Sequence, residues 1–263
     1  MKPILYNTDM VRAIQDDRKT ATRRLVKPQP GRTAKFVTDN LLPETVEAGS
    51  GGVYCFSDGT VIGAPYQPGD ILYVRETWGW NYCYDCGMAD GGLDIVDLND
   101  GHIESDPFRC DDEAAERVFF AKEKEYGCYC YKASAEDDEI PEGDGHWHPS
   151  IHMPKEAARL FLRVTDVRAE RLRDITDEQA IAEGTTGISC DHPNSFVAGG
   201  AVCCVDCMNT GWLEPPTVNF AEIWDSTVKP ADLARYGWNA NPWVWVIEFE
   251  RISKEEALKN ERS

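Results

Sequence analysis

QPGDILYVRETW, residues 67–78, combines a turn signal with a run of residues typical of a buried strand. The Pro-Gly-Asp triplet at 68–70 has the composition that tight turns require. Segment 71–78 is rich in β-branched and aromatic side chains, so we expect a strand there. Because side chains alternate between the two faces of a strand, Glu76 and Trp78 are expected to share a face.

Two further strands and a helix are indicated downstream. Leu160–Leu172 alternates in its second half, and Trp243–Glu250 has the composition of a closing strand. Between them, Thr176 is followed three residues later by Gln179, which is a capping-box arrangement. We therefore expect a helix to begin after Thr176 and to end at Gly184, since glycine is favoured just past a helix.

The N-terminal segment predicts a short helix followed by a basic turn. Thr8 or Asp9 is available as the helix cap, and one apolar face is formed by Met10, Val11 and Ile14. Residues 18–24, RKTATRR, are expected to form the basic turn, after which prolines end regular structure. A further short helix is expected around residues 220–224.

The order of these elements favours an α+β fold. Short strands around one or two helices suit a small, partly open β-barrel better than a doubly wound sheet, because the βα alternation is too sparse for parallel crossovers. We expect one domain over residues 1–263, with two loop-rich insertions at about 80–148 and about 185–216. The first insertion is expected to contain at most a hairpin, at 118–131.

The charge of the chain argues against a long nucleic-acid groove. Its net charge is −19, with 27 basic and 46 acidic residues. Nonspecific affinity for DNA or RNA needs Lys and Arg to neutralise phosphates, so such acidity serves solubility or meets a basic partner. No apolar run approaches the ~20 residues of a membrane span, and the N-terminus lacks a signal-peptide core. We expect a cytoplasmic location and no membrane partner.

The spacing of the ten cysteines predicts a structural zinc. Cys-x2-Cys pairs are typical of metal sites, and tetrahedral zinc needs four ligands. One ligand set is self-contained in the second insertion and comprises Cys190, His192, Cys204 and Cys207. The alternative set joins Cys83 and Cys86 to the pair at 204 and 207. A zinc ion bound by either set of ligands would stabilise an insertion that is poor in apolar residues.

Four motifs, in this order, resemble ASCH-domain proteins encoded by phages and prophages. They are KPIL through RKTATRR (2–24), PGDILYVRETW (68–78), PSIHMP (149–154) and LRDIT through AEG (172–184). The resemblance spans the chain but skips both insertions. It implies the PUA-like (ASCH) fold, a small mixed β-barrel with flanking short helices, and a pocket that recognises a nucleobase or nucleoside.

The resemblance also implies three catalytic residues. A minimal bacterial relative in this family hydrolyses the N4-acetyl group of acetylcytidine with a lysine, a threonine and a glutamate, and these roles fall on Lys19, Thr22 and Glu183 here. A threonine hydroxyl becomes a nucleophile when a base takes its proton, and a lysine serves as that base if its pKa is lowered. The alternative is that all three are ordinary surface residues, with Glu183 closing a helix. The sequence departs from the family at Asp17, where glycine is frequent.

Arg23, Glu76 and Trp78 are the predicted substrate-binding residues. The carboxylate of Glu76 would form hydrogen bonds with the edge of a base, and the indole of Trp78 would stack on the base. The alternative assigns Trp78 to the core and Glu76 to a salt bridge. Three functions remain open: an amidohydrolase acting on N4-acylated cytidine, a noncatalytic reader of a modified base in RNA or DNA, and an acidic phage protein that inhibits a host nucleic-acid enzyme. The expected partner is a nucleoside or an exposed modified base.

Overall fold

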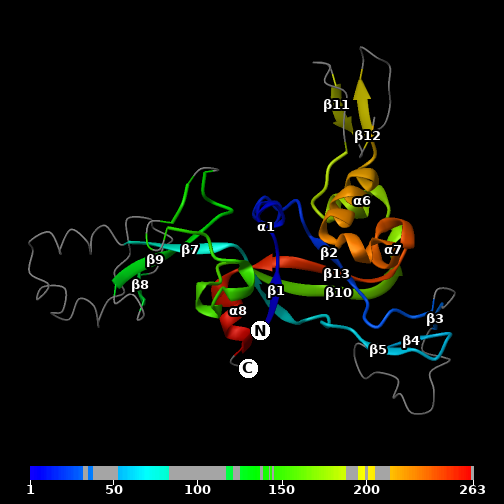
Figure 1. Cartoon of the computed structure of the whole chain (residues 1–263), viewed down its shortest axis with the longest axis horizontal. Coiled ribbons are helices and arrows are strands. Elements are labelled where there is room, and N and C mark those ends of the chain that lie inside the picture. The colour runs from blue at the N-terminus through cyan, green and yellow to red at the C-terminus, as the bar shows by residue number, and fades with distance from the viewer. Residues whose placement is uncertain are drawn as a thin grey trace, which may run out of the picture. The chain divides into compact units, whose positions relative to one another are not determined.

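The computed structural model divides the chain into two compact units (Figure 1). The first comprises Met1–Lys2, Ala13–Leu72 and Leu160–Ser263, and the second comprises Pro3–Arg12 and Tyr73–Arg159. The structure describes residues 1–31, 35–37, 53–82, 117–120, 125–136, 139–141, 143, 145–187, 195–198, 201–204 and 214–261. The expected single domain with two insertions stays a prediction, because most of both insertions lies outside the described residues.

A five-stranded mixed sheet is the largest element of regular structure. Its order is β1-β6-β10-β13-β2, and its strands span Lys2–Leu5, Ile71–Arg75, Phe161–Arg171, Trp243–Ile252 and Ala21–Leu25. The α+β class is thus confirmed. The expected barrel is not: the described strands form an open sheet that begins with β1 and ends with β2.

The long strands β10 and β13 form an antiparallel pair in the first unit, clearly visible in Figure 1. β13 is buried from Trp243 to Ile247, as its aromatic and β-branched composition predicts. The pairing runs from Phe161 opposite Ile252 to Arg171 opposite Trp243, and a β-bulge interrupts it between Val164 and Asp166. Both strands were therefore predicted correctly, except that the alternation in β10 begins only after the bulge.

The expected basic turn is largely a strand. Residues 21–25 form β2 and pair antiparallel with β13, from Ala21 opposite Glu248 to Leu25 opposite Val244. The prediction of a turn was wrong because β13 offers an unpaired edge, and tertiary pairing overrides a local cluster of charges. A strand here fixes which side chains of the basic segment share a face.

Helix α1 spans Thr8–Gln15, as expected, but its cap differs. The Met10 amide N–H donates to Asn7 Oδ1 at 2.9 Å, so Asn7 caps the helix instead of Thr8 or Asp9. The helix starts one residue earlier than the expected caps allow. Val11 and Ile14 of the predicted apolar face are buried.

Helix α5 spans Asp177–Ala182 and has the predicted capping box: Thr176 Oγ1 accepts from the Gln179 amide, and Gln179 Oε1 accepts from the Thr176 amide. Gly184 follows with φ of 91°, the left-handed conformation in which glycine ends a helix. Helix α6, Pro216–Thr227, confirms the helix expected around 220–224. One core cluster joins these helices to β13 and comprises Leu172, Ile175, Ala180, Phe220, Trp224, Val244 and Val246.

Smaller elements complete the first unit. β3 (Phe36–Val37), β4 (Val53–Phe56) and β5 (Val61–Gly63) form a three-stranded sheet, and β11 (Ser195–Ala198) pairs with β12 (Ala201–Cys204). The remaining helices are η4 (Leu172–Asp174), η5 (Pro230–Asp232), α7 (Leu233–Tyr236), η6 (Trp238–Ala240) and α8 (Lys254–Glu261). Among the described residues, no helix has the length and apolar character needed to cross a bilayer.

The second unit holds a three-stranded sheet ordered β7-β9-β8, with strands Trp78–Tyr82, Glu125–Tyr131 and Arg117–Phe120. The antiparallel β8–β9 pair is the expected hairpin, but the prediction of at most a hairpin was too small, because β9 also pairs with β7. Short helices η2 and η3 follow at Ser150–His152 and Lys155–Ala157. The strand expected over 71–78 is broken at Glu76, whose amide N–H lies 3.2 Å from Met153 Sδ instead of joining a strand ladder.

The turn at Gly184 provides a test of the fold. A Cβ at this position would lie 3.0 Å from Ala13 Cβ and 3.2 Å from Lys19 Cβ, and φ is positive. We expect Gly184→Ala to lower the free energy of unfolding by about 1–3 kcal/mol, measured by urea denaturation. Gly63→Ala is the matched control, since no atom lies within 4 Å of its Cβ position. Equal stability of the two variants would contradict the turn.

Candidate functional site

A buried polar cluster in the first unit comprises Lys19, Arg23, Gln179 and Glu183. Lys19 is 2% exposed, and its Nζ donates to the Glu183 carbonyl oxygen at 2.8 Å and to Glu183 Oε2 at 2.7 Å. Arg23 donates from Nη1 to Glu183 Oε1 at 3.2 Å and from Nη2 to Gln179 Oε1 at 3.0 Å. Each oxygen of the Glu183 carboxylate therefore accepts from a different basic side chain.

Helix α5 and strand β2 together position this polar cluster. Gln179 and Glu183 are four residues apart, so they lie on one face of the helical turn. The capping box fixes Gln179, because Oε1 accepts from the Thr176 amide as well as from Arg23. Backbone contact adds to these bonds, since Lys19 and Glu183 form an isolated antiparallel bridge. These contacts hold the end of α5 beside the segment that leads into β2.

Burial changes the acid–base character of Lys19. Withdrawal from water lowers the pKa of the ammonium below its ordinary value of 10.5. The charge of Glu183 and its hydrogen bond oppose this shift, while the neighbouring cations Arg24 and Arg23 reinforce it. The net direction is downward, which increases the fraction of unprotonated amine near neutral pH. An unprotonated amine is the form that can accept a proton.

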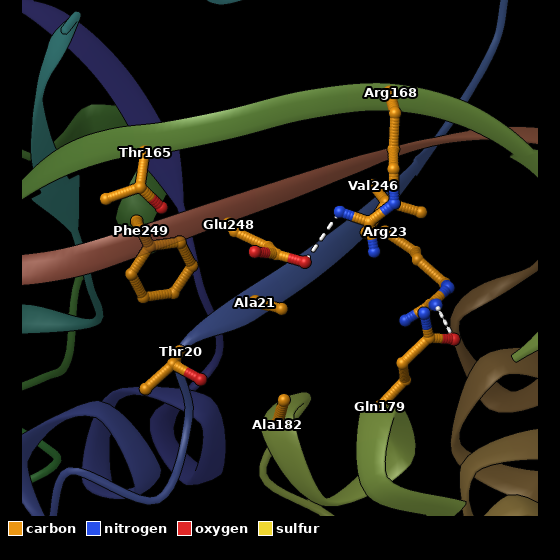
Figure 2. A pocket seen from close by; sticks show the side chains of 10 residues that line it. All are labelled: Thr20, Ala21, Arg23, Thr165, Arg168, Gln179, Ala182, Val246, Glu248 and Phe249. Atoms are coloured by element: carbon orange, nitrogen blue, oxygen red, sulfur yellow. Dashed lines mark hydrogen bonds and ion pairs between the residues drawn. The ribbon is translucent and has the colours of Figure 1, made fainter. Parts of the chain in front are cut away.

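A pocket of about 240 Å³ adjoins the polar cluster in the first unit (Figure 2). Arg23 and Gln179 belong both to its lining and to the cluster. Polar and aromatic side chains complete the wall, among them Thr20, Arg168, Glu248 and Phe249. The volume is below the roughly 300 Å³ at which typical ligand pockets begin, so it suits a small ligand.

Arg168 organises the carboxylates beside the pocket. Its Nη1 donates to Asp166 Oδ2 at 2.7 Å and to Glu248 Oε1 at 2.6 Å, and its Nε donates to Glu170 Oε1 at 2.5 Å. Glu170 Oε2 also lies 3.6 Å from Arg23 Nη2. The pocket lining is thereby joined to the buried polar cluster through a continuous set of ion pairs.

Thr22 lies on the strand that carries this site, but on its other face. It is 3% exposed and pairs with Ile247 of β13, whereas Arg23 pairs with Val246. Since successive side chains of a strand point to opposite faces, Thr22 faces away from Arg23. The structure thus brings together Lys19, Arg23 and Glu183. A catalytic role for any of these residues stays a prediction.

Glu76 and Trp78 belong to the second unit. Glu76 is 1% exposed, and Arg159 donates to both of its oxygens at 2.9 Å, which is the salt bridge considered as the alternative. Trp78 stacks on His148 with ring centroids 4.6 Å apart. Its Nε1 is buried and has no hydrogen-bond acceptor among the described residues. Substrate binding by this pair stays a prediction.

The predicted zinc ligands fall almost entirely outside the described residues. This applies to Cys190, His192 and Cys207, and also to Cys83 and Cys86 of the alternative set. Cys204 ends strand β12, where its backbone pairs with Ser195. Elsewhere in the described part of the chain, no group of three or more potential metal ligands gathers. The zinc stays a prediction.

Sequence reasoning missed several residues of the pocket wall, namely Thr20, Arg168, Gln179 and Glu248. Glu248 carried a usable signal, because it is an acid within the otherwise apolar segment Trp243–Phe249. A charged residue inside a buried strand is costly unless it is paired or functional. Gln179 was assigned only to the helix cap, where its Oε1 indeed accepts from the Thr176 amide.

The burial of Lys19 makes stability depend on pH. Between its lowered pKa and 10.5, the unfolded chain holds a proton that the folded chain has released, so the Lys19 contribution to the free energy of unfolding rises with pH. We expect the stability of the wild type relative to Lys19→Met to increase as the pH rises toward 10.5 in urea denaturation. Exposed Lys229→Met should show no such trend, and a flat or falling Lys19 difference would contradict the lowered pKa.

Comparisons with known proteins do not identify this chain. No protein-family model, no curated protein and no solved structure matches it. Its function is therefore inferred from the buried polar cluster and from the pocket beside it.

Proposed function

We propose that the chain binds a nucleobase or nucleoside in the pocket beside the polar cluster, as a phage-type ASCH protein of the PUA-like superfamily. We propose further that it hydrolyses an N4-acylated cytidine, with Lys19 as the base. One observation carries this proposal: Lys19, fully buried and with a lowered pKa, is held by Glu183 in a cluster that shares Arg23 with the pocket wall.

The dimensions and charge of the site support a single nucleoside over a polymer. A cavity of about 240 Å³ lies below the roughly 300 Å³ at which pockets for drug-sized ligands begin, so it suits one small ligand instead of several consecutive nucleotides. The net charge of −19 opposes the counterion release on which polymer binding depends. A small uncharged ligand is therefore not repelled by the negative charge of the chain.

The proposed reaction is amide hydrolysis through an acyl-enzyme. Unprotonated Lys19 takes the proton of the Thr22 hydroxyl while the oxygen attacks the acyl carbon. The carbon–nitrogen bond breaks, the amino group of the base takes a proton from the lysine ammonium, and water then hydrolyses the threonine ester. A guanidinium such as that of Arg23 is suited to stabilise the oxyanion.

A specific observation favours noncatalytic recognition as the second candidate. Lys19 Nζ already has two acceptors on Glu183, and alternation directs Thr22 to the other face of β2. Catalysis through Thr22 would therefore require rearrangement. Thr20, in contrast, lines the pocket directly. A binding protein for a modified base needs the pocket but not the nucleophile.

Hydrolysis is tested with N4-acetylcytidine and a panel of other acylated nucleosides. We expect release of the free acid by the wild type, and a loss of at least about a hundredfold in kcat/KM in Lys19→Met, because general-base assistance contributes about that much. Lys229→Met, which alters an exposed lysine, should retain full activity. Product formation is followed by chromatography. Wild-type protein without turnover on the whole panel would exclude the hydrolase.

The two threonines are compared by matched substitutions. Thr22→Ala is expected to abolish turnover and Thr20→Ala to retain it, since the hydroxyl of Thr22 is the proposed nucleophile. The opposite result would transfer the nucleophile to Thr20.

Salt dependence separates a reader of polymeric RNA or DNA from a nucleoside hydrolase, because a polymer reader loses affinity steeply with rising salt and a nucleoside hydrolase does not.

A further inference from the structure

Glu248 faces the pocket with half of its carboxylate unused. Its side chain is 43% exposed, and Oε1 accepts from Arg168 Nη1 at 2.6 Å. No residue in the described part of the chain donates to Oε2. Figure 2 shows the carboxylate between Arg168 and Phe249, with its second oxygen on the Phe249 side of the cavity. A strong acceptor is thus presented to any bound ligand.

The position of Glu248 is electrostatically unfavourable. It lies directly opposite Asp166 in the β10–β13 pair, and like charges in that arrangement destabilise a sheet. Arg168 Nη1 bridges the two acids, which reduces but does not remove the conflict. Its strand neighbours Ile247 and Phe249 are buried and apolar. A local conflict of this kind is typical of a functional position.

Hydrogen-bond donors without acceptors lie in the same wall. Gln179 uses Oε1 twice, for Arg23 and for the Thr176 amide, and its amide nitrogen has no acceptor among the described residues. Arg23 is 1% exposed at its side chain, and its Nε is likewise without an acceptor in the described part of the structure. The pocket therefore combines one free carboxylate oxygen with amide and guanidinium donors.

The charge around the pocket disfavours an anion. The basic side chains Lys19, Arg23 and Arg168 are each bonded to carboxylates, and those carboxylates are Asp166, Glu170, Glu183 and Glu248. Within this group the acids outnumber the bases, and the guanidinium groups of Arg23 and Arg168 already share their charge with carboxylates. An entering phosphate would compete with existing ion pairs.

We propose that Glu248 determines the specificity of the pocket: its free oxygen accepts a hydrogen bond from an amino N–H of an uncharged heterocycle, and its charge excludes phosphorylated ligands. Bases with a carbonyl in place of that amino group would face the carboxylate with a second acceptor. The inference rests on the proposed function only in taking the ligand to be a nucleoside, and it does not depend on hydrolysis.

Calorimetric titration with cytidine, uridine and cytidine 5′-monophosphate tests this assignment. Wild-type protein is expected to bind cytidine at least about tenfold more tightly than either of the others, as one charge-assisted hydrogen bond allows. Glu248→Gln should weaken cytidine binding about ten- to hundredfold and abolish the preference over uridine, because the neutral amide pairs with either base edge.

Asp166→Asn is the matched control. It removes one of the two carboxylates held by Arg168 Nη1, but Asp166 is absent from the pocket lining, so cytidine affinity should stay within about twofold. Glu248→Asp keeps the charge and withdraws the oxygen by one methylene. It should weaken cytidine binding while still excluding the monophosphate. If a thermal melt shows that Glu248→Gln is unfolded, Glu248→Asp becomes the variant that tests the role of the Glu248 oxygen.

Three results would overturn the assignment: equal losses in Glu248→Gln and Asp166→Asn, monophosphate bound as tightly as cytidine, or no binding of any of the three compounds. Failure of the proposed hydrolysis is a separate result. Selective, Glu248-dependent cytidine binding without turnover would exclude the hydrolase and support the specificity role. Turnover that needs Lys19 but is unaffected by Glu248→Gln would exclude the specificity role alone.

Discussion

An ammonium group withdrawn from water dictates the geometry of the first unit around it. Removing Lys19 from solvent costs several kcal/mol unless close acceptors replace the lost hydration. Glu183 supplies two such acceptors, its carbonyl and its carboxylate. The end of α5 must therefore lie against the segment that leads into β2. The tight turn at Gly184 follows from the same requirement, because a side chain there would meet the stem of Lys19.

The helix that meets this requirement is too short to hold its own position. α5 has six residues, and helices of that length are not stable in isolation. Its capping box satisfies the first amide groups, and Ala180 anchors it in the core cluster with β13 and α6. Packing thus fixes Glu183, and Glu183 fixes Lys19 and Arg23. The acid–base properties of the site depend on contacts made on the far side of the helix.

Local signals predicted the elements that local interactions form. The capping box at Thr176 and the strand Trp243–Glu250 were predicted from neighbouring residues alone, and both are present. β2 was missed, because its partner is distant in sequence and only tertiary pairing turns a basic segment into a strand. The grouping of Lys19 with Glu183 came from a family resemblance. The Asp166–Glu248 pair depends on strand register across a bulge, which no local pattern encodes.

That bulge has an evolutionary consequence. Thr165 is the additional residue, since Val164 pairs with Phe249 and Asp166 pairs with Glu248. The bulge accommodates this extra residue, so that Val164 and Asp166, although two positions apart, lie opposite consecutive residues of β13 and therefore on opposite faces. If the strand had the same length but no bulge, every side chain from Asp166 onward would exchange faces, and charged side chains would enter the apolar layer. Sequence drift along this strand can therefore replace side chains, whereas an insertion or deletion after the bulge that no second bulge absorbs would dismantle the pocket wall.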